Sequence, residues 1–413
     1  MNEHGHITIR SRKFSEGHFF SMMHHRPGFY SGKGGKGRGK GHLGHRMDMA
    51  DEFSAGQPAS NYCKFFITGN CAAGATCRHK HDLKRLAEVH KAHSGVINSV
   101  ILADGLIWTA GADTSLRSWK PVPTADGLDI QPAGPPVECG EAVTSLLWDP
   151  SRKALLCGLN SGTIRVFTRE PLGQLDLRGH TGAVYSMVLV QNVLVTASWD
   201  GSVRTWQGDN FTAGVCIEAT RIPVGSIRLV KVFGGRMWLG GVSGVCAIDL
   251  QSLQVSLSVG LDSPVMSIVE YSPTQSVIVA TLSASIKIIQ QQTGLVTQSV
   301  DLAEIEAHSH APPYHSKGRG KGHSNFSWSA KGSNTSVVSL EGMMLGNSGK
   351  PVVVVGDQSG TCKVLELPSL EMRGQWFAHS KGSDIRNILS TNENHIFITT
   401  ASDGCLAVWQ WQV

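Results

Sequence analysis

The chain has 413 residues, an ordinary apolar content of 41% and a formal net charge of +5. No apolar run is long enough to span a membrane, and the first twenty residues lack the continuous apolar core of a signal peptide, so we expect neither a membrane segment nor secretion. The length allows two or three domains, or one large repeat domain.

The basic residues are concentrated near the start of the chain. Residues 1–92 carry 15 Lys and Arg against 7 Asp and Glu, whereas the remainder carries 22 against 25. Segment 32–46 consists of Gly, Lys, Arg and His apart from one Leu and cannot bury enough apolar surface to fold, so we predict that residues 1–59 form a disordered basic arm. Its heptapeptide Lys36–His42 recurs unchanged as Lys317–His323. The two copies favour loose contacts with phosphates over the alternatives, a solubilising tail or compositional drift.

Four residues after the arm have the spacing of metal ligands. Cys63, Cys71, Cys77 and His81 follow the order C-x7-C-x5-C-x3-H. Three thiolates and one imidazole suit a closed tetrahedral Zn²⁺ site, which is structural rather than catalytic. The segment is too short for a hydrophobic core, so metal binding would supply its folding free energy. The sequence predicts one structural Zn²⁺ in a finger over residues 60–83.

This motif resembles the CCCH zinc-finger family, in which aromatic side chains usually stack on the bases of single-stranded RNA. The resemblance marks five candidate RNA contacts, Phe65, Phe66, Arg78, His79 and Lys80. The family often carries aromatic residues where this chain has Ala73 and His79, which predicts a modest RNA affinity for the finger alone. The alternative is a finger that packs on a neighbouring domain. The other six cysteines are scattered, as free thiols of a reducing compartment would be, so we expect the nucleus and/or the cytoplasm.

A repeat appears beyond the finger. Three times, a Trp has an Asp six residues before it, a Thr four residues before that Asp, and a His further upstream. The sets are His93, Thr109, Asp113 and Trp119; His180, Thr196, Asp200 and Trp206; and His379, Thr399, Asp403 and Trp409. The pattern resembles the WD40 repeat, whose four side chains form a hydrogen-bonded tetrad within one blade. Because each buried polar group needs its partner, we expect these tetrads to be structural rather than catalytic.

Four weaker repeats lie between these three, and their third strands end at Phe167, Ile248, Ile289 and Leu365. The intervals are near the 40–45 residues of one blade, except one of 76, which a disordered insertion over 303–334 explains. We therefore predict a mainly β fold, a seven-bladed WD40-like propeller over 84–413 preceded by a small CCCH zinc finger. A strand at about 84–91 would close the ring against the last repeat and mount the finger on the rim.

One CCCH finger followed by seven such blades resembles the plant-type zinc finger (CCCH) WD40 repeat proteins over about residues 60–413. The resemblance implies an RNA-binding adaptor, whose finger and basic tracts contact single-stranded RNA and whose propeller recruits protein partners. The alternative is a protein-interaction scaffold, for example a ubiquitin-ligase substrate receptor, with a purely structural finger. The sequence has no nucleophile elbow, phosphate loop or open metal site, so we expect no enzyme and no small-molecule substrate.

Overall fold

The computed structural model describes residues 62–412, apart from 69, 74–75, 125–126, 169–172, 303–335, 346–348 and 392–394. The predicted arm (1–59) and the predicted insertion (303–334) lie outside the described residues. Their disorder, and the division of the chain into domains, stay predictions. Among the described helices, none is both long and apolar enough to cross a membrane.

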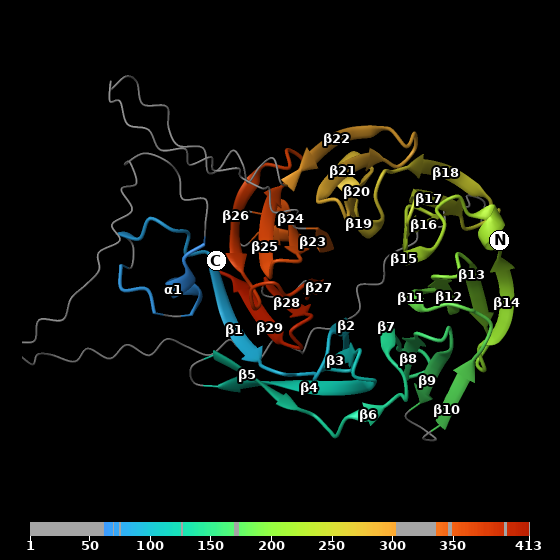
Figure 1. Ribbon diagram of the computed structural model, residues 1–413, viewed down its shortest axis with the longest axis horizontal. Coiled ribbons are helices and arrows are strands. Elements are labelled where there is room, and N and C mark those ends of the chain that lie inside the picture. The colour runs from blue at the N-terminus through green and yellow to red at the C-terminus, as the bar shows by residue number, and fades with distance from the viewer. Residues whose placement is uncertain are drawn as a thin grey trace, which may run out of the picture.

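The described strands form seven antiparallel sheets, or blades, arranged in a ring (Figure 1). Blades 1 to 3 consist of β2 (Ile97–Ala103), β3 (Leu106–Gly111), β4 (Ser115–Thr124) and β5 (Gly127–Pro132), with β6 (Val137–Glu138) beside β4; β7 (Val143–Asp149), β8 (Ala154–Leu159), β9 (Ile164–Thr168) and β10 (Gly173–Leu177); and β11 (Val184–Val190), β12 (Val193–Ser198), β13 (Val203–Gln207) and β14 (Thr212–Ile217).

Blades 4 to 7 continue the same order around the ring. They consist of β15 (Ile227–Phe233), β16 (Arg236–Gly241), β17 (Gly244–Asp249) and β18 (Val255–Gly260); β19 (Val265–Tyr271), β20 (Ser276–Thr281), β21 (Ser285–Gln290) and β22 (Val296–Asp301); β23 (Val337–Leu345), β24 (Lys350–Asp357), β25 (Thr361–Glu366) and β26 (Met372–Phe377); and β27 (Ile385–Ser390), β28 (Ile396–Ala401), β29 (Leu406–Trp411) and β1 (Leu83–Val89). The predicted seven-bladed propeller is confirmed.

The ring closes where the two ends of the propeller meet. β1 pairs antiparallel with β29, with Leu83 opposite Trp411 and Val89 opposite Leu406. Without β1, the outer edge of β29 would present unpaired backbone groups to other chains. The prediction that a strand just after the finger closes the last blade is therefore confirmed.

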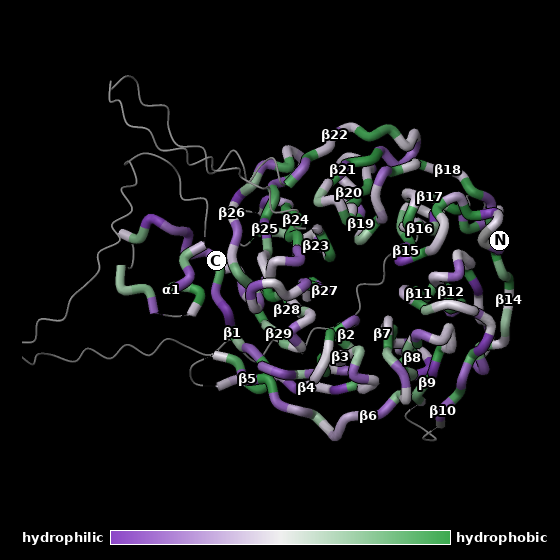
Figure 2. Tube along the Cα trace, viewed as in Figure 1, coloured by the Kyte–Doolittle hydropathy of each residue, from purple (hydrophilic) through white to green (hydrophobic). Residues whose placement is uncertain are grey.

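Apolar side chains from neighbouring blades pack together and hold the ring. The described residues form seven buried clusters, each drawn mainly from two adjacent blades. Figure 2 shows apolar segments in every blade. Middle strands such as β8 and β20 are buried along their whole length, because a blade is covered on both faces by its neighbours. No single core therefore dominates the propeller.

Hydrogen bonds join the four tetrad side chains in blades 1 and 3. In blade 7 they join His379, Thr399 and Trp409, whereas His379 Nδ1 only lies close to Asp403 without a hydrogen bond. In blade 1, His93 Nε2 lies 2.8 Å from Thr109 Oγ1, His93 Nδ1 lies 2.8 Å from Asp113 Oδ1, and Trp119 Nε1 donates to the Thr109 hydroxyl at 2.9 Å. The corresponding distances are 2.9, 3.1 and 3.0 Å in blade 3 and 2.9, 3.3 and 2.9 Å in blade 7. All three histidine side chains are fully buried. We call the face that carries the three tetrad aspartates the tetrad face.

The tetrad histidines of blades 1 and 3 make stability depend on pH. Burial lowers the pKa of His93 and of His180, although Asp113 and Asp200 act in the opposite direction. The unfolded chain takes up these protons near pH 6.5, and the folded tetrads take them up only at lower pH. Stability is therefore full above about pH 6.5 and is lost as the pH falls towards the folded pKa values. We expect the melting temperature to fall between about pH 7.5 and 5.5. Cys77→Ser, which leaves the tetrads intact, should show the same fall; pH-independent melting would contradict the idea.

Blades 2 and 6 hold other polar groups in place of a tetrad, exposed in blade 2 and buried in blade 6. In blade 6, Lys363 pairs with Asp357, both side chains are 1% exposed, and Asp357 also accepts hydrogen bonds from Ser359. In blade 2, Glu141 precedes Ser161 by the same 20 residues that separate His93 from Asp113, and it accepts from the Ser161 amide at 2.9 Å and hydroxyl at 2.8 Å. Two of the degenerate blades thus use polar links that differ from the tetrad in their donors and acceptors.

Candidate metal centre and nucleic-acid interface

Three cysteines and one histidine meet beside the short helix α1 (Lys64–Ile67), at the outer edge of the ring (Figure 1). The ligand atoms of Cys63, Cys71, Cys77 and His81 all lie within 4.8 Å of one another, and the Sγ atoms of Cys63 and Cys77 are 3.7 Å apart. Tetrahedral coordination with metal–sulfur bonds near 2.3 Å places two sulfurs roughly 3.8 Å apart. The spacing therefore fits one four-coordinate metal ion.

The His81 imidazole is held ready for a ligand. Its Nε2 atom is buried and has no hydrogen-bond partner among the described residues. A buried ring nitrogen without a partner costs free energy unless something binds it. The Phe66 ring stacks on the imidazole with ring centroids 4.2 Å apart and planes 8° apart, which fixes the orientation of the ring. The Nε2 atom of His81 is therefore available as the fourth ligand of a metal ion bound by the three cysteines.

The first ligand is positioned by the start of α1. Cys63 caps this helix, and its Sγ accepts a hydrogen bond from the Phe66 amide at 3.4 Å. The Cys63 amide donates to the Lys80 carbonyl at 2.9 Å, next to a parallel bridge between Tyr62 and Lys80. These bonds bring the two ends of the segment side by side, so that the first and last ligands meet.

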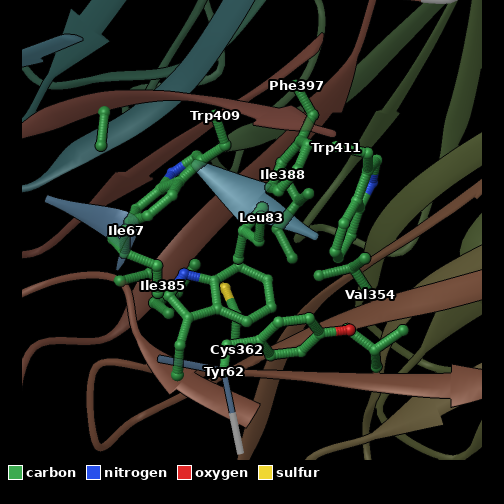
Figure 3. Close-up of a cluster of buried hydrophobic side chains, with 14 of the residues drawn as sticks. Tyr62, Ile67, Leu83, Val354, Cys362, Ile385, Ile388, Phe397, Trp409 and Trp411 are labelled. Atoms are coloured by element: carbon green, nitrogen blue, oxygen red, sulfur yellow. The ribbon is translucent and has the colours of Figure 1, made fainter. Parts of the chain in front are cut away.

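One side of the finger is part of the propeller core (Figure 3). Tyr62 is 4% exposed, and its ring centroid lies 5.6 Å from that of Trp376 in β26 and 5.8 Å from that of Trp411 in β29. Ile67, at the end of α1, joins the same cluster beside Leu83 of β1. The finger therefore docks on the outer strands of blades 6 and 7, as expected for a finger mounted on the rim.

Polar groups reinforce this docking. The Lys80 ammonium donates to the backbone carbonyl of Arg373 in β26, and burial lowers the pKa of Lys80. The Arg373 guanidinium pairs with Asp82 at 2.7 Å and with Glu366 at 3.1 Å. The Asp82 carbonyl in turn accepts from the Gln412 amide at 2.8 Å. The short connection between finger and β1 is thus tied to two blades.

The five candidate RNA contacts do not share one surface. Phe65 is 53% exposed, and Arg78 is also exposed. Phe66 instead covers the His81 imidazole on one face, and His79 is half-buried. Lys80 faces the propeller rather than solvent, because its ammonium is bound to Arg373. Of the five, Phe65 and Arg78 therefore offer the best access to a ligand.

A groove of about 370 Å³ lies between the end of α1 and β1. It is lined by Ile67, Thr68, Lys84, Arg85, Leu86, Ala87, Glu88 and Gly127. Arg85 pairs with Glu88 at 2.5 Å, whereas Lys84 has no ion pair in the described part of the chain. The sequence predicts that β1 closes the ring, but it does not predict this groove. The basic residue Lys84, close to the finger, was the one signal for it. The prediction from sequence also missed Tyr62, whose aromatic ring directly before the first ligand was a signal for docking.

Comparisons with known proteins agree with this architecture. Residues 170–207, which include β11 to β13, match the family model described as WD domain, G-beta repeat. The rice protein "Zinc finger CCCH domain-containing protein 17" (Oryza sativa subsp. japonica) is 23% identical over 362 residues, which cover 85% of this chain and 73% of that protein. "Zinc finger CCCH domain-containing protein 48" of Arabidopsis thaliana is 27% identical over 158 residues, which cover 37% of this chain and about a third (34%) of that protein's length.

A solved structure shares the fold. The WD40 β-propeller domain of Doa1 superposes with a TM-score of 0.57 at 16% identity, over 79% of this chain and 97% of that chain. The propeller, the WD repeat and the Cys3His cluster next to it are the three features that the sequence predicted. In these three features the chain is similar to proteins that combine a CCCH zinc finger with a WD40 propeller.

Proposed function

We propose that this chain is a non-enzymatic, zinc-binding adaptor of the nucleus or cytoplasm that binds single-stranded RNA through its finger and protein partners through its propeller. The main support is the orientation of the finger. Tyr62 and Ile67 dock it onto the ring, while Phe65 remains 53% exposed. An exposed aromatic ring beside a basic surface suits a splayed RNA base.

The donor set favours zinc as the bound metal. Thiolates and imidazole are the ligands that Zn²⁺ prefers, and four protein ligands leave no open position for substrate. Cys63, Cys71, Cys77 and His81 would hold the ion, which would stabilise the fold of the finger. Two contacts keep ligands in place: the Phe66 ring stacks on the His81 imidazole, and Cys63 caps helix α1.

The groove beside the finger offers a path for the RNA backbone. Lys84 lines it, and Lys64 holds its ammonium 5.1 Å from the centre of the Phe65 ring. A base stacked beside Phe65 would leave a phosphate near Lys64, and a strand that continues along the groove would pass Lys84. Such a site reads single strands without requiring a particular sequence.

A second candidate function is a protein-interaction scaffold whose finger is purely structural. The observation in its favour is the burial of Tyr62 and Ile67 in a core shared with Trp376 and Trp411. A finger that packs against the junction of blades 6 and 7 stabilises the propeller even if it binds no RNA. The two candidates differ in what the exposed side of the finger does.

Binding of a fluorescein-labelled random 12-nucleotide RNA, followed by anisotropy, separates the candidates. The wild-type chain should hold one zinc per molecule and bind RNA more tightly than duplex DNA of random sequence. Affinity should fall with salt, with a slope of about −0.7 per phosphate neutralised. Phe65→Ala removes a stacking surface worth about 1–3 kcal/mol per base, so RNA should bind roughly tenfold more weakly. Cys77→Ser should lose both zinc and RNA binding.

Lys84→Gln is the test of the groove, and Lys153→Gln, an exposed lysine in the β7–β8 turn of blade 2, is its matched control. The first variant should reduce both affinity and salt slope, and the second should leave them unchanged. RNA binding that is undetectable at low salt, or that is equal in wild type and Phe65→Ala, would support the scaffold instead.

A further inference from the structure

Two aromatic rings and an arginine form a partly exposed corner on the tetrad face, between blades 3 and 4. Tyr185 belongs to β11, Trp199 to the turn between β12 and β13, and Arg228 to β15. The two rings meet edge to face, with centroids 5.9 Å apart and planes at 75°. The Arg228 guanidinium carbon lies 5.5 Å from the centre of the Tyr185 ring and 6.0 Å from that of Trp199. The rings thus hold the cation in a fixed orientation.

Arg228 has no anionic partner within the described parts of the chain. Among the described residues, no carboxylate pairs with it. Besides the effect of burial, the pKa of Arg228 is raised by Tyr185 and, to a smaller extent, lowered by another cation, Arg386 of β27. Its nitrogens do not belong to the buried unpartnered atoms, so they reach the surface. Burial, followed by the charge of Arg386, lowers the pKa of Arg228, but a guanidinium stays protonated in proteins. Arg228 is thus fixed, half-buried and without a carboxylate among the described residues. Such a guanidinium favours the binding of an anionic group from another molecule.

The surroundings favour a single anionic side chain over a nucleic acid. Arg386 already pairs with Asp384 at 2.9 Å, so the two arginines and this aspartate leave roughly one uncompensated positive charge. An RNA strand needs a row of cations for successive phosphates. One guanidinium instead fits one carboxylate or phosphate through two parallel hydrogen bonds. Trp199, 42% exposed, adds an apolar wall for the rest of a peptide residue.

We propose that Arg228, Tyr185 and Trp199 form a docking site on the tetrad face for an acidic peptide segment of a protein partner, with Arg228 bound to one carboxylate or phosphate of that segment. The inference rests on the proposed recruitment of protein partners by the propeller and names the chemistry of that recruitment. It does not depend on RNA binding by the finger.

Degenerate peptide arrays test the site with the full-length protein. One position of each seven-residue peptide is fixed as glutamate, phosphoserine, glutamine or lysine, which separates the carboxylate and phosphate sources from neutral and basic controls. The wild type should bind the glutamate or phosphoserine set at least about tenfold better than the glutamine set, and Arg228→Gln should abolish this preference. Trp199→Ala, a change in an exposed turn, should weaken binding of the preferred set.

Two controls make the outcome decisive. Arg178→Gln removes another arginine, 76% exposed and already paired with Asp176 at 3.5 Å, and should change nothing. Cys77→Ser should keep peptide binding while it loses RNA binding, so that failure of this site and failure of the finger are distinguishable. No acidic preference in the wild type, a preference that survives Arg228→Gln, or equal loss of random 12-nucleotide RNA binding in Arg228→Gln would each overturn the proposal.

Discussion

Removal of residues 1–92 should leave a propeller that does not close. This truncation deletes β1, so that β29 loses its outer partner and Trp411 loses the contact with Leu83. Seven blades then end in an exposed edge, which invites pairing with other chains. We expect aggregation, or a thermal transition without cooperativity, measured by calorimetry and light scattering.

Two shorter truncations are the controls. Removal of residues 1–61 keeps every described residue and should melt like the full chain. Removal of residues 1–82 keeps β1 but deletes Tyr62 and Ile67 from the shared core, which should cost about 3–5 kcal/mol while the ring survives. If the 1–82 and 1–92 truncations melt at the same temperature, β1 does not close the ring in solution.

Breaking the buried ion pair of blade 6 should cause the largest loss of stability from a single substitution. Asp357→Ala leaves the Lys363 ammonium, 1% exposed, without its carboxylate. An uncompensated buried charge costs about 3–5 kcal/mol, because the interior cannot replace the lost partner or the lost water. Lys363→Met should cost a similar amount, since it strands Asp357. Urea unfolding of each variant measures these losses.

The double variant gives the sharper result. Asp357→Ala combined with Lys363→Met removes both charges and should recover a large part of the lost stability. Lys350→Met is the matched control, since Lys350 is 60% exposed and lies 3.8 Å from Glu366; its loss should stay below about 1 kcal/mol. Additive losses in the double variant would show that the two side chains do not form a coupled pair.

The fold was predictable from the sequence because its restraints recur at fixed intervals. His93, His180 and His379 each need a Thr and an Asp at set distances along the chain, so three complete tetrads indicate the blade length and the count. The degenerate blades keep the strand pattern but change the polar link. Glu141 with Ser161 and Asp357 with Lys363 form polar links of other residue types, which the repeat pattern does not predict.

The metal cluster was also predictable, because its four ligands lie within one short segment. The orientation of the finger was not, because it depends on residues far away in the sequence. Lys80 looked like an RNA contact among other basic residues, yet it binds the carbonyl of Arg373 in β26. In the same way, Arg228, Tyr185 and Trp199 come from three strands or turns, and only the ring brings them together.

The pairing of Leu83 with Trp411 also has a consequence for synthesis on the ribosome. β1 emerges early, directly after the four metal ligands, whereas its partner β29 is the last strand of the structure to be made. The finger can therefore bind its metal while blades are still being added one after another. Until β29 appears, the backbone edge of β1 has no strand to pair with. Synthesis of β29, rather than the folding of any one blade, is then the event that seals the propeller.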